Sequence, residues 1–143
     1  MRRNRILAVI PAYNEQDNIV STIEDLRNCV PDIDYVVIND GSKDQTLDIC
    51  KERGYNYVDL PVNLGLAGAF QTGMRYALEH GYDYAIQFDA DGQHSAAYID
   101  EMVEVAQRAE ANIVIGSRFA TQKKPVSARM AGSVLISAMI MLT

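Results

Sequence analysis

Five short β-rich runs alternate with helical patterns along this chain, and this alternation limits the fold more than any other feature. The runs cover residues 6–10, 35–39, 55–59, 84–89 and 112–116. Those at 36–39, 84–88 and 112–116 are apolar without clean alternation, which is typical of strands covered on both faces in a parallel sheet. The order of elements predicts a doubly wound α/β fold, with helices on both faces of a mostly parallel sheet.

Each helical pattern carries one apolar stripe. The first contains Ile19, Ile23, Leu26 and Val30, and the fourth contains Ile99, Met102, Val103 and Ala106. Their three- and four-residue spacing predicts helices with one buried face. We expect Gly54 and Gly81 to end two helices, and Asp44 and Ser95 to be N-caps just ahead of helical runs.

The C-terminal stretch, residues 126–143, is apolar with scattered serines and a glycine, and Arg129 is its one charge. We expect a buried or interfacial helix here, because a helix that crosses a bilayer needs about 20 apolar residues. The sequence ends within this pattern, at Met141, Leu142 and Thr143. We therefore expect the fold to be truncated, as a fragment of a longer protein.

The acidic charge balance argues against a nucleic-acid partner. The net charge is -6, from 19 acids and 13 bases, whereas neutralising a phosphate backbone needs a basic surface. Residues 117–143 contain no acid. Their bases are Arg118, Lys123, Lys124 and Arg129. Two interpretations of this basic tail stay open: contact with phosphate or an anionic membrane surface, and a solvated loop.

The two cysteines, Cys29 and Cys50, fall on predicted helices without C-x-x-C spacing or clustered histidines. Neither a zinc site nor a disulfide framework is expected, and a reducing compartment fits best. Near the N-terminus, the apolar run at 6–10 is too short for a signal peptide before Pro11 interrupts it. We expect a cytoplasmic protein, and the sequence does not indicate its oligomeric state.

Polar residues follow four of the five β-rich runs. Ligands of open parallel sheets bind beyond the carboxyl ends of the strands, so these positions are candidates for a site. They are Pro-Ala-Tyr-Asn-Glu at 11–15, Asn-Asp-Gly-Ser at 39–42, Asp-Ala-Asp-Gly-Gln-His at 89–94 and Gly-Ser-Arg at 116–118. The sequence therefore predicts four loops around one ligand.

Asp89 and Asp91 are the sharpest chemical signal in these loops. Two carboxylates one residue apart on a tight turn point to the same side and share a hard cation, so Mg²⁺ or Mn²⁺ is the expected metal. Gln93 either adds a neutral oxygen ligand or binds a phosphate through its amide, and His94 is a weaker candidate. The alternative is an acidic turn that caps the next helix, but the position after a central strand favours the metal site.

The remaining loop residues are ambiguous one by one. Asp40 either accepts a hydrogen bond from a nucleobase N–H or belongs to an ordinary Asp-Gly turn with Gly41. Tyr13, Asn14 and Glu15 can each be explained by local structure alone. A site is indicated because these residues and Asp40 occur together on one rim of the sheet. A glycine-rich helix entry contains Asn63, Gly65, Gly68 and Gly73. It suits phosphate binding or close helix packing, and it lacks the dinucleotide and P-loop fingerprints.

Five segments together resemble the family 2 glycosyltransferases with the GT-A fold. They are V-I-P-A-Y-N-E, V-I-N-D-G-S-K-D, N-L-G-L-A-G-A, F-D-A-D-G-Q-H and I-G-S-R-F, within residues 6–119. The pattern is most similar to dolichyl- or polyprenyl-phosphate sugar transferases and related bacterial cell-wall enzymes. Two departures, Asn39 in place of Asp and Ser95-Ala96 in place of prolines, remove neither a metal contact nor a base contact.

The resemblance implies a role for each matching residue. Pro11, Tyr13 and Glu15 would line the nucleotide pocket, Asp40 would read the base, Ala90 would lie against the ribose, Asp89 and Asp91 would handle ribose and metal, Gln93 would help to hold the metal, and Arg118 would approach the donor phosphates or sugar. Asp89 and Asp91 are thus the expected catalytic residues, and no general base is assigned.

The activity implied is metal-dependent, inverting transfer of a sugar from a UDP- or GDP-linked donor to a polyprenyl phosphate or a glycan, at the cytoplasmic face of a membrane. Residues 1–125 would be the donor-binding domain, and 126–143 would lead into an acceptor-side segment. Two alternatives stay open. One is a magnesium-dependent phosphatase of the haloacid dehalogenase type, in which the Asp pair follows the first strand, and the other is a non-catalytic nucleotide-binding domain.

Overall fold

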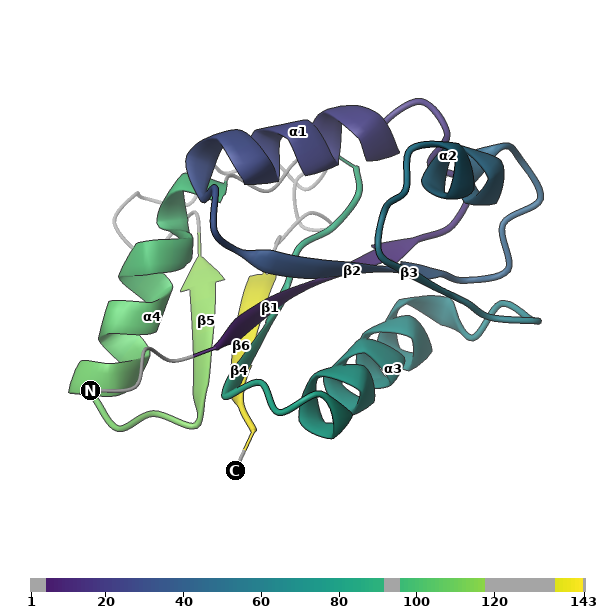
Figure 1. Ribbon diagram of the computed structural model, residues 1–143. Coiled ribbons are helices and arrows are strands. Elements are labelled where there is room, and N and C mark those ends of the chain that lie inside the picture. The colour runs from purple at the N-terminus through teal and green to yellow at the C-terminus, as the bar shows by residue number, and fades with distance from the viewer. Residues whose placement is uncertain (1–4, 92–95, 118–135, 143) are drawn as a thin grey trace, which may run out of the picture.

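The computed structural model describes residues 5–91, 96–117 and 136–142, and shows one six-stranded sheet between helices (Figure 1). The strands are β1 (Ile6–Ala12), β2 (Asp34–Asn39), β3 (Tyr57–Asp59), β4 (Tyr84–Gln87), β5 (Ile113–Ser117) and β6 (Ile136–Met141). The helices are α1 (Ile19–Cys29), α2 (Thr46–Glu52), α3 (Gly65–Glu79) and α4 (Ile99–Arg108), and a 3-10 turn, Ala96–Tyr98, precedes α4. The strand order is β3-β2-β1-β4-β6-β5.

Strands β1 to β4 form a parallel sheet, as the sequence predicts. β1 pairs in parallel with β2 and with β4, and β2 pairs in parallel with β3. Side chains alternate between two cores along β1: Ala8 and Ile10 join one cluster, and Leu7 and Val9 join the other. All four are completely buried, so this strand is covered on both faces.

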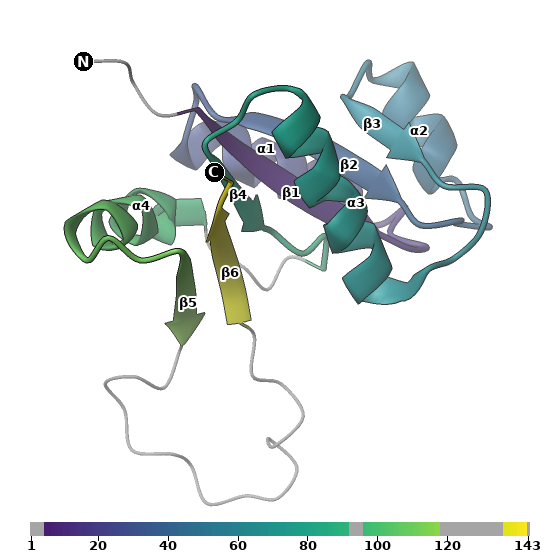
Figure 2. The same ribbon diagram turned by 90° about the horizontal axis from the view of Figure 1, so that it is seen from below.

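Helices cover the two faces of the sheet unequally. α1 and α4 lie on one face with a large shared core, and α3 crosses the other face over β1 and β2 (Figure 2). A Cβ at Gly73 of α3 would lie 2.1 Å from Cγ1 of Val9. Glycine at this position therefore lets α3 lie closer to β1 than any side chain would allow, which is the packing explanation that the sequence left open.

Glycines end α2 and α3 as expected. Gly54 and Gly81 have positive φ angles of 64° and 71°. The residue after each glycine donates its N–H back into the helix, from Tyr55 to Cys50 and from Tyr82 to Ala77. These bonds satisfy carbonyl groups that a helix end leaves unpaired. They also explain why β3 begins at Tyr57, later than the predicted start at residue 55.

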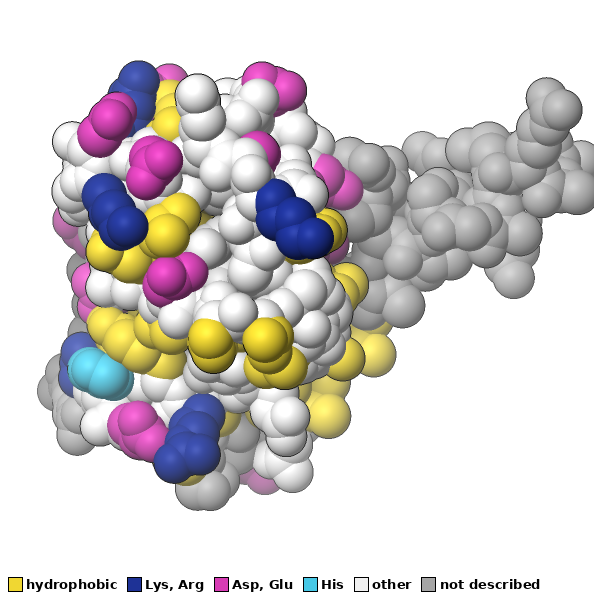
Figure 3. All heavy atoms as spheres, turned by 90° about the vertical axis from the view of Figure 1, so that its right-hand side faces the viewer, with side chains coloured by type: hydrophobic (Ala, Val, Ile, Leu, Met, Phe, Trp, Pro, Cys, Tyr) yellow, Lys and Arg dark blue, Asp and Glu magenta, His cyan; other side chains and the backbone are white. Residues whose placement is uncertain are grey.

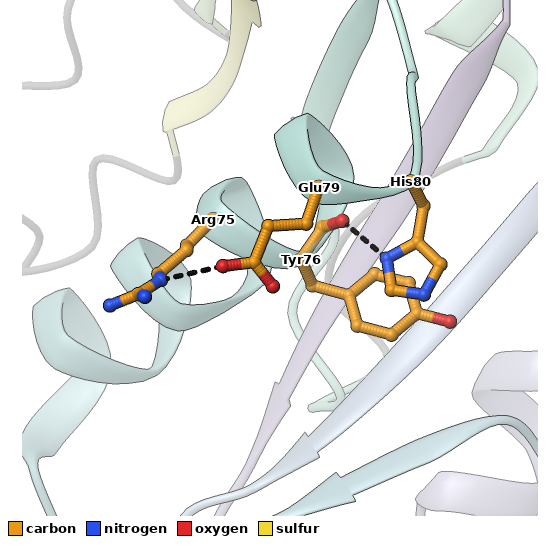
Figure 4. Close-up of polar contacts among 4 residues, drawn as sticks. All are labelled: Arg75, Tyr76, Glu79 and His80. Carbon is orange, nitrogen blue, oxygen red and sulfur yellow. Dashed lines mark hydrogen bonds and ion pairs between the residues drawn. The ribbon is translucent and has the colours of Figure 1, made fainter.

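Figure 4 shows the outer face of α3 near this end of the helix. The rings of Tyr76 and His80 stack with centroids 3.9 Å apart, and Nδ1 of His80 lies 2.8 Å from the carbonyl oxygen of Tyr76. In the same turns, offset by one residue along the chain, Nε of Arg75 donates to Oε1 of Glu79 at 2.8 Å. These i,i+4 contacts support the last turns of α3 at the end of the helix opposite Gly65.

The C-terminal helix predicted over 126–143 is wrong where the structure describes that stretch, because residues 136–141 form β6. β6 is antiparallel to both of its neighbours, β4 and β5. β1 pairs with one edge of β4, and the backbone groups of the other edge also need hydrogen-bond partners when they are buried. β6 supplies them, so long-range pairing decides the structure of this apolar segment.

β5 lies at the edge of the sheet and is not the central strand predicted from its apolar run. Val114 packs towards the core that α4 shares, whereas Ile113 and Ile115 are 57% and 58% exposed. Other boundaries shift by a few residues: β1 continues to Ala12, and β4 ends at Gln87, before Asp89. Ser95, the second predicted N-cap, lies outside the described residues.

Candidate functional site

A pocket of about 410 Å³ opens at the carboxyl ends of β1, β2 and β4. It is lined by Pro11, Ala12, Tyr13, Glu15, Asp40, Asn63, Gly65, Leu66, Ala69, Asp89, Ala90 and Asp91. Three of the four predicted loops therefore meet around one cleft, joined by the start of α3. Gln93, His94 and Arg118 lie outside the described residues, so the structure does not place them.

Asp40 lines this pocket and is only 3% exposed. Its N–H donates to the carbonyl of Ala12 at 2.8 Å, and its Oδ1 accepts the N–H of Leu64 at 2.7 Å. The adjacent Gly41 has a φ of 69°, and a Cβ there would lie 2.8 Å from the backbone nitrogen of Asn63. Asp40 and Gly41 thus form the tight turn expected from the sequence, and this turn fixes the Asp40 carboxylate in the lining of the cleft.

The loop after β1 is cross-linked to the loop after β2. Asp44 accepts the N–H groups of Gln16 and Thr46 and the hydroxyl of Thr46, while the N–H of Glu15 donates to Thr46 Oγ1. Burial raises the pKa of Asp44, but these hydrogen bonds outweigh burial and leave that pKa below its ordinary value. The N-cap of α2 is Gln45, so the predicted N-cap Asp44 is wrong by one residue. Asp44 nevertheless accepts the N–H of Thr46, the first residue of the helix.

The turn that carries Asp89 and Asp91 is anchored to α1 and to β4. Ala90, between the two carboxylates, is 2% exposed and accepts the hydroxyl of Thr22 through its carbonyl at 3.0 Å. Gln87 Nε2 donates to Asp89 Oδ1 at 2.8 Å. Within the described ranges, no group of three or more His, Cys, Asp or Glu side chains forms a metal cluster.

The entry to α3 supplies pocket residues that the sequence left ambiguous. Gly65 has a φ of 76° and donates its N–H to Asn63 Oδ1 at 3.0 Å, and both residues line the cleft together with Leu66. The sequence signal for these pocket residues was the N-L-G-L pattern. It was ambiguous because glycine also allows close helix packing, as at Gly73. Val62, Leu64 and Leu66 are each more than half exposed. Figure 3 shows hydrophobic side chains gathered in a band across this end of the molecule.

Asn39, one of the two departures from the family pattern noted in the sequence, lies beneath the site and is 1% exposed. Its Nδ2 donates to Asp59 Oδ1 at 2.7 Å, and its backbone carbonyl oxygen accepts the N–H of Leu60. Within the described residues, Asn39 Oδ1 is a buried side-chain atom without a hydrogen-bond partner. An amide here joins β2 to β3 without placing two carboxylates in contact.

The profile of glycosyl transferase family 2 matches residues 7–140, which is nearly the whole chain. The chain belongs to this family. The undecaprenyl-phosphate mannosyltransferase of Micrococcus luteus is 37% identical over 119 residues, which cover 80% of this chain and 48% of that protein. A Methanococcus voltae protein, UDP-N-acetylglucosamine--dolichyl-phosphate N-acetylglucosaminyltransferase, is 33% identical over 136 residues, 83% of this chain and 54% of that protein. The chain spans about half the length of these curated relatives.

Solved structures confirm the GT-A fold expected for this family 2 chain. S. aureus TarS in complex with UDP-GlcNAc superposes with a TM-score of 0.70 at 14% identity, over 96% of this chain and 45% of that one. The mannosyltransferase PcManGT from Pyrobaculum calidifontis, in complex with GDP-Man and Mn²⁺, has a TM-score of 0.67 at 20% identity, over 78% of this chain and 35% of that one. In the described part of this chain, no helix combines the length and apolar character needed to cross a bilayer.

Proposed function

We propose that this chain is the donor-binding half of a glycosyltransferase and holds a nucleoside-diphosphate sugar in the pocket at the strand ends. The observation that supports this proposal is the meeting of Asp40, Glu15, Asp89 and Asp91 in one cleft, although they come from three separate loops. Membership of the family and the nucleotide-sugar complexes of TarS and PcManGT agree with it. They do not favour the phosphatase alternative.

The nucleoside is assigned to the wall formed by the loops after β1 and β2. Pro11, Tyr13 and Glu15 surround it, and the carboxylate of Asp40 accepts a base N–H. Tyr13 is 43% exposed, so its ring is available to cover a bound base. The small side chain of Ala90 leaves room for the ribose. The buried carboxylate of Asp40 is a fixed acceptor, so it discriminates against bases that have no N–H at that place.

The diphosphate is assigned to the opposite wall, where Asp89 and Asp91 would hold a divalent cation. Carboxylate oxygens are suitable ligands for Mg²⁺ and Mn²⁺, and two of them leave positions for phosphate oxygens. Mn²⁺ is our first choice, because PcManGT was solved with it. When bound, the cation stabilises negative charge on the departing nucleoside diphosphate. Gln93 as a further ligand and Arg118 near the phosphates remain predictions.

For the transfer step we propose a polyprenyl phosphate as acceptor, after the relatives named for undecaprenyl and dolichyl phosphates. An oxygen of the acceptor phosphate forms a bond to the anomeric carbon, and the bond from that carbon to the diphosphate oxygen breaks. The electron pair leaves with the nucleoside diphosphate, and the configuration inverts. Because the acceptor oxygen is already anionic, no general base is needed. The reaction would take place at the cytoplasmic face of a membrane.

Calorimetry with UDP and GDP, each with and without Mn²⁺, tests the donor-binding proposal. We expect micromolar to millimolar affinity for one nucleotide, dependent on the metal. Asp91→Asn keeps the shape of the side chain but removes its charge, and should abolish the metal dependence. Asp100→Asn, on α4 outside the pocket, is the matched control and should bind as the wild type does. Metal-independent binding, or equal loss in both variants, would contradict the assignment.

A further inference from the structure

Hydrogen bonds in both directions join the loop after β1, residues 13–16, to residues 42–46, which are the loop after β2 and the first residue of α2. Asn14 N–H donates to Ser42 Oγ at 3.0 Å, Lys43 N–H to Asn14 Oδ1 at 2.8 Å, Glu15 N–H to Thr46 Oγ1 at 2.9 Å, Gln16 N–H to Asp44 Oδ2 at 3.1 Å and Gln45 N–H to Gln16 Oε1 at 3.1 Å. Each loop both donates and accepts, so neither can shift alone without leaving amide groups unpaired.

Asn14 is unusual among these hydrogen-bonded residues because its backbone is left-handed, with a φ of 56°. Residues with a Cβ seldom adopt this region, and asparagine tolerates it better than most. Its side chain also accepts the N–H of Lys43, while its own N–H donates to Ser42. Glycine would provide the backbone angle alone, and alanine would provide neither the angle nor the acceptor. Asparagine satisfies both requirements at this position.

The position of Asn14 connects this geometry to the cleft. Its two chain neighbours, Tyr13 and Glu15, both line the pocket, but neither Asn14 nor Ser42 is among the described residues that line it. The left-handed turn sits between two pocket side chains and sets the directions in which they leave the backbone. Through Ser42 and Lys43, the same residue fixes these directions relative to the loop that begins with Asp40.

We propose that Asn14 is a positioning residue: it holds Tyr13 and Glu15 opposite Asp40, so that the nucleoside wall of the pocket is formed before the ligand arrives. The inference rests on the donor-binding function proposed above. A preformed wall removes the ordering that a ligand would otherwise have to impose on the loops, and affinity depends on that ordering. Asn14 thereby raises nucleotide affinity without touching the nucleotide.

Three variants separate the two properties of Asn14. Asn14→Gly keeps the left-handed turn and removes the acceptor for Lys43, Asn14→Ala removes both, and Ser42→Ala removes the partner of the Asn14 N–H from the other loop. Asn28→Ala, on the exposed face of α1, is the matched control. For each variant we would measure the dissociation constant for the nucleotide that the wild type binds with Mn²⁺, and confirm folding by circular dichroism at the same temperature.

We expect about a fivefold loss of affinity in Asn14→Gly and in Ser42→Ala, corresponding to one hydrogen bond, and no change in the control. Asn14→Ala should lose more if it folds, and the Asn14→Gly and Ser42→Ala variants carry the test if it does not. In the double variant Asn14→Gly/Ser42→Ala, the combined loss of affinity should be smaller than the product of the two single losses, because the two hydrogen bonds join the same pair of loops.

A role in stability alone would lower the melting temperature but leave the affinity of the folded protein unchanged. Affinities of Asn14→Gly and Ser42→Ala within twofold of wild type would therefore overturn the inference. A wild-type chain that binds neither nucleotide would instead refute the donor-binding function itself, so the two failures are distinguishable.

Discussion

The parallel strands β1 and β2 and the edge strand β5 have similar apolar sequences but different surroundings. Val36 and Ile38 on β2 are completely buried under α3, whereas Ile113 and Ile115 on β5 are more than half exposed. α3 covers β1 and β2 and does not reach the same face of β5 (Figure 2). An apolar run thus predicts that a strand forms, while the layer above it decides whether that strand belongs to the core.

Truncation of one isoleucine in each region tests this difference most directly. Ile38→Ala should lower the free energy of unfolding by about 2–5 kcal/mol, because it leaves a cavity between β2 and α3. Ile115→Ala removes the same atoms from an exposed site and should change it by about 0.5 kcal/mol or less. Urea denaturation at constant m-value measures both changes. Equal losses would show that the face of β5 is covered in solution.

A smaller effect is expected where α3 meets β1. Alanine favours helix over glycine, yet Gly73→Ala should lower the free energy of unfolding by about 1–3 kcal/mol, because the new methyl group overlaps Val9. Val9→Ala in the same chain should recover much of the loss by removing the opposing methyl groups. Urea denaturation of the two single variants and the double variant gives the coupling free energy between positions 73 and 9. Stabilisation by Gly73→Ala alone would mean that the two elements separate readily.

The smallest effect concerns the thiol of Cys50, which packs in the core beneath the parallel strands. Burial raises its pKa from 9.0 to about 11. Since the folded protein disfavours the thiolate, the free energy of unfolding should fall as the pH rises from 9 to 11, by about 1 kcal/mol at pH 10. Cys50→Ala should lack this component of the pH dependence. Chemical denaturation of both proteins at pH 8 and pH 10 measures the difference.

The sequence predicted the parallel half well because the information there is local. Apolar runs identified β1, β2 and β4, and the rule that ligands bind beyond strand ends brought Glu15, Asp40 and Asp89 together as candidates. β6 was missed, because its strand conformation comes from pairing with β4 and β5, and nothing within residues 136–141 specifies these partners.

The same distinction explains what was missed at the site. Leu66 and Ala69 reach the pocket from α3, and only the packing of α3 on β1 brings them there. Asn14 was recognised as a member of a motif, but its motif did not reveal the left-handed backbone. The glycines of the helix entry had two explanations, and the structure divides them: Gly65 lines the pocket, and Gly73 makes the helix contact.

The antiparallel position of β6 has a consequence for the cleft. Since β6 is antiparallel to both neighbours, β5 points the same way as β4, and its last residue, Ser117, lies at the edge of the sheet where the pocket opens. Ser117 is the backbone partner of Ile136, so both anchors of the intervening connection are at that rim. The carboxyl end of β5 and the amino end of β6 therefore lie side by side at the same end of the sheet as the carboxyl end of β4.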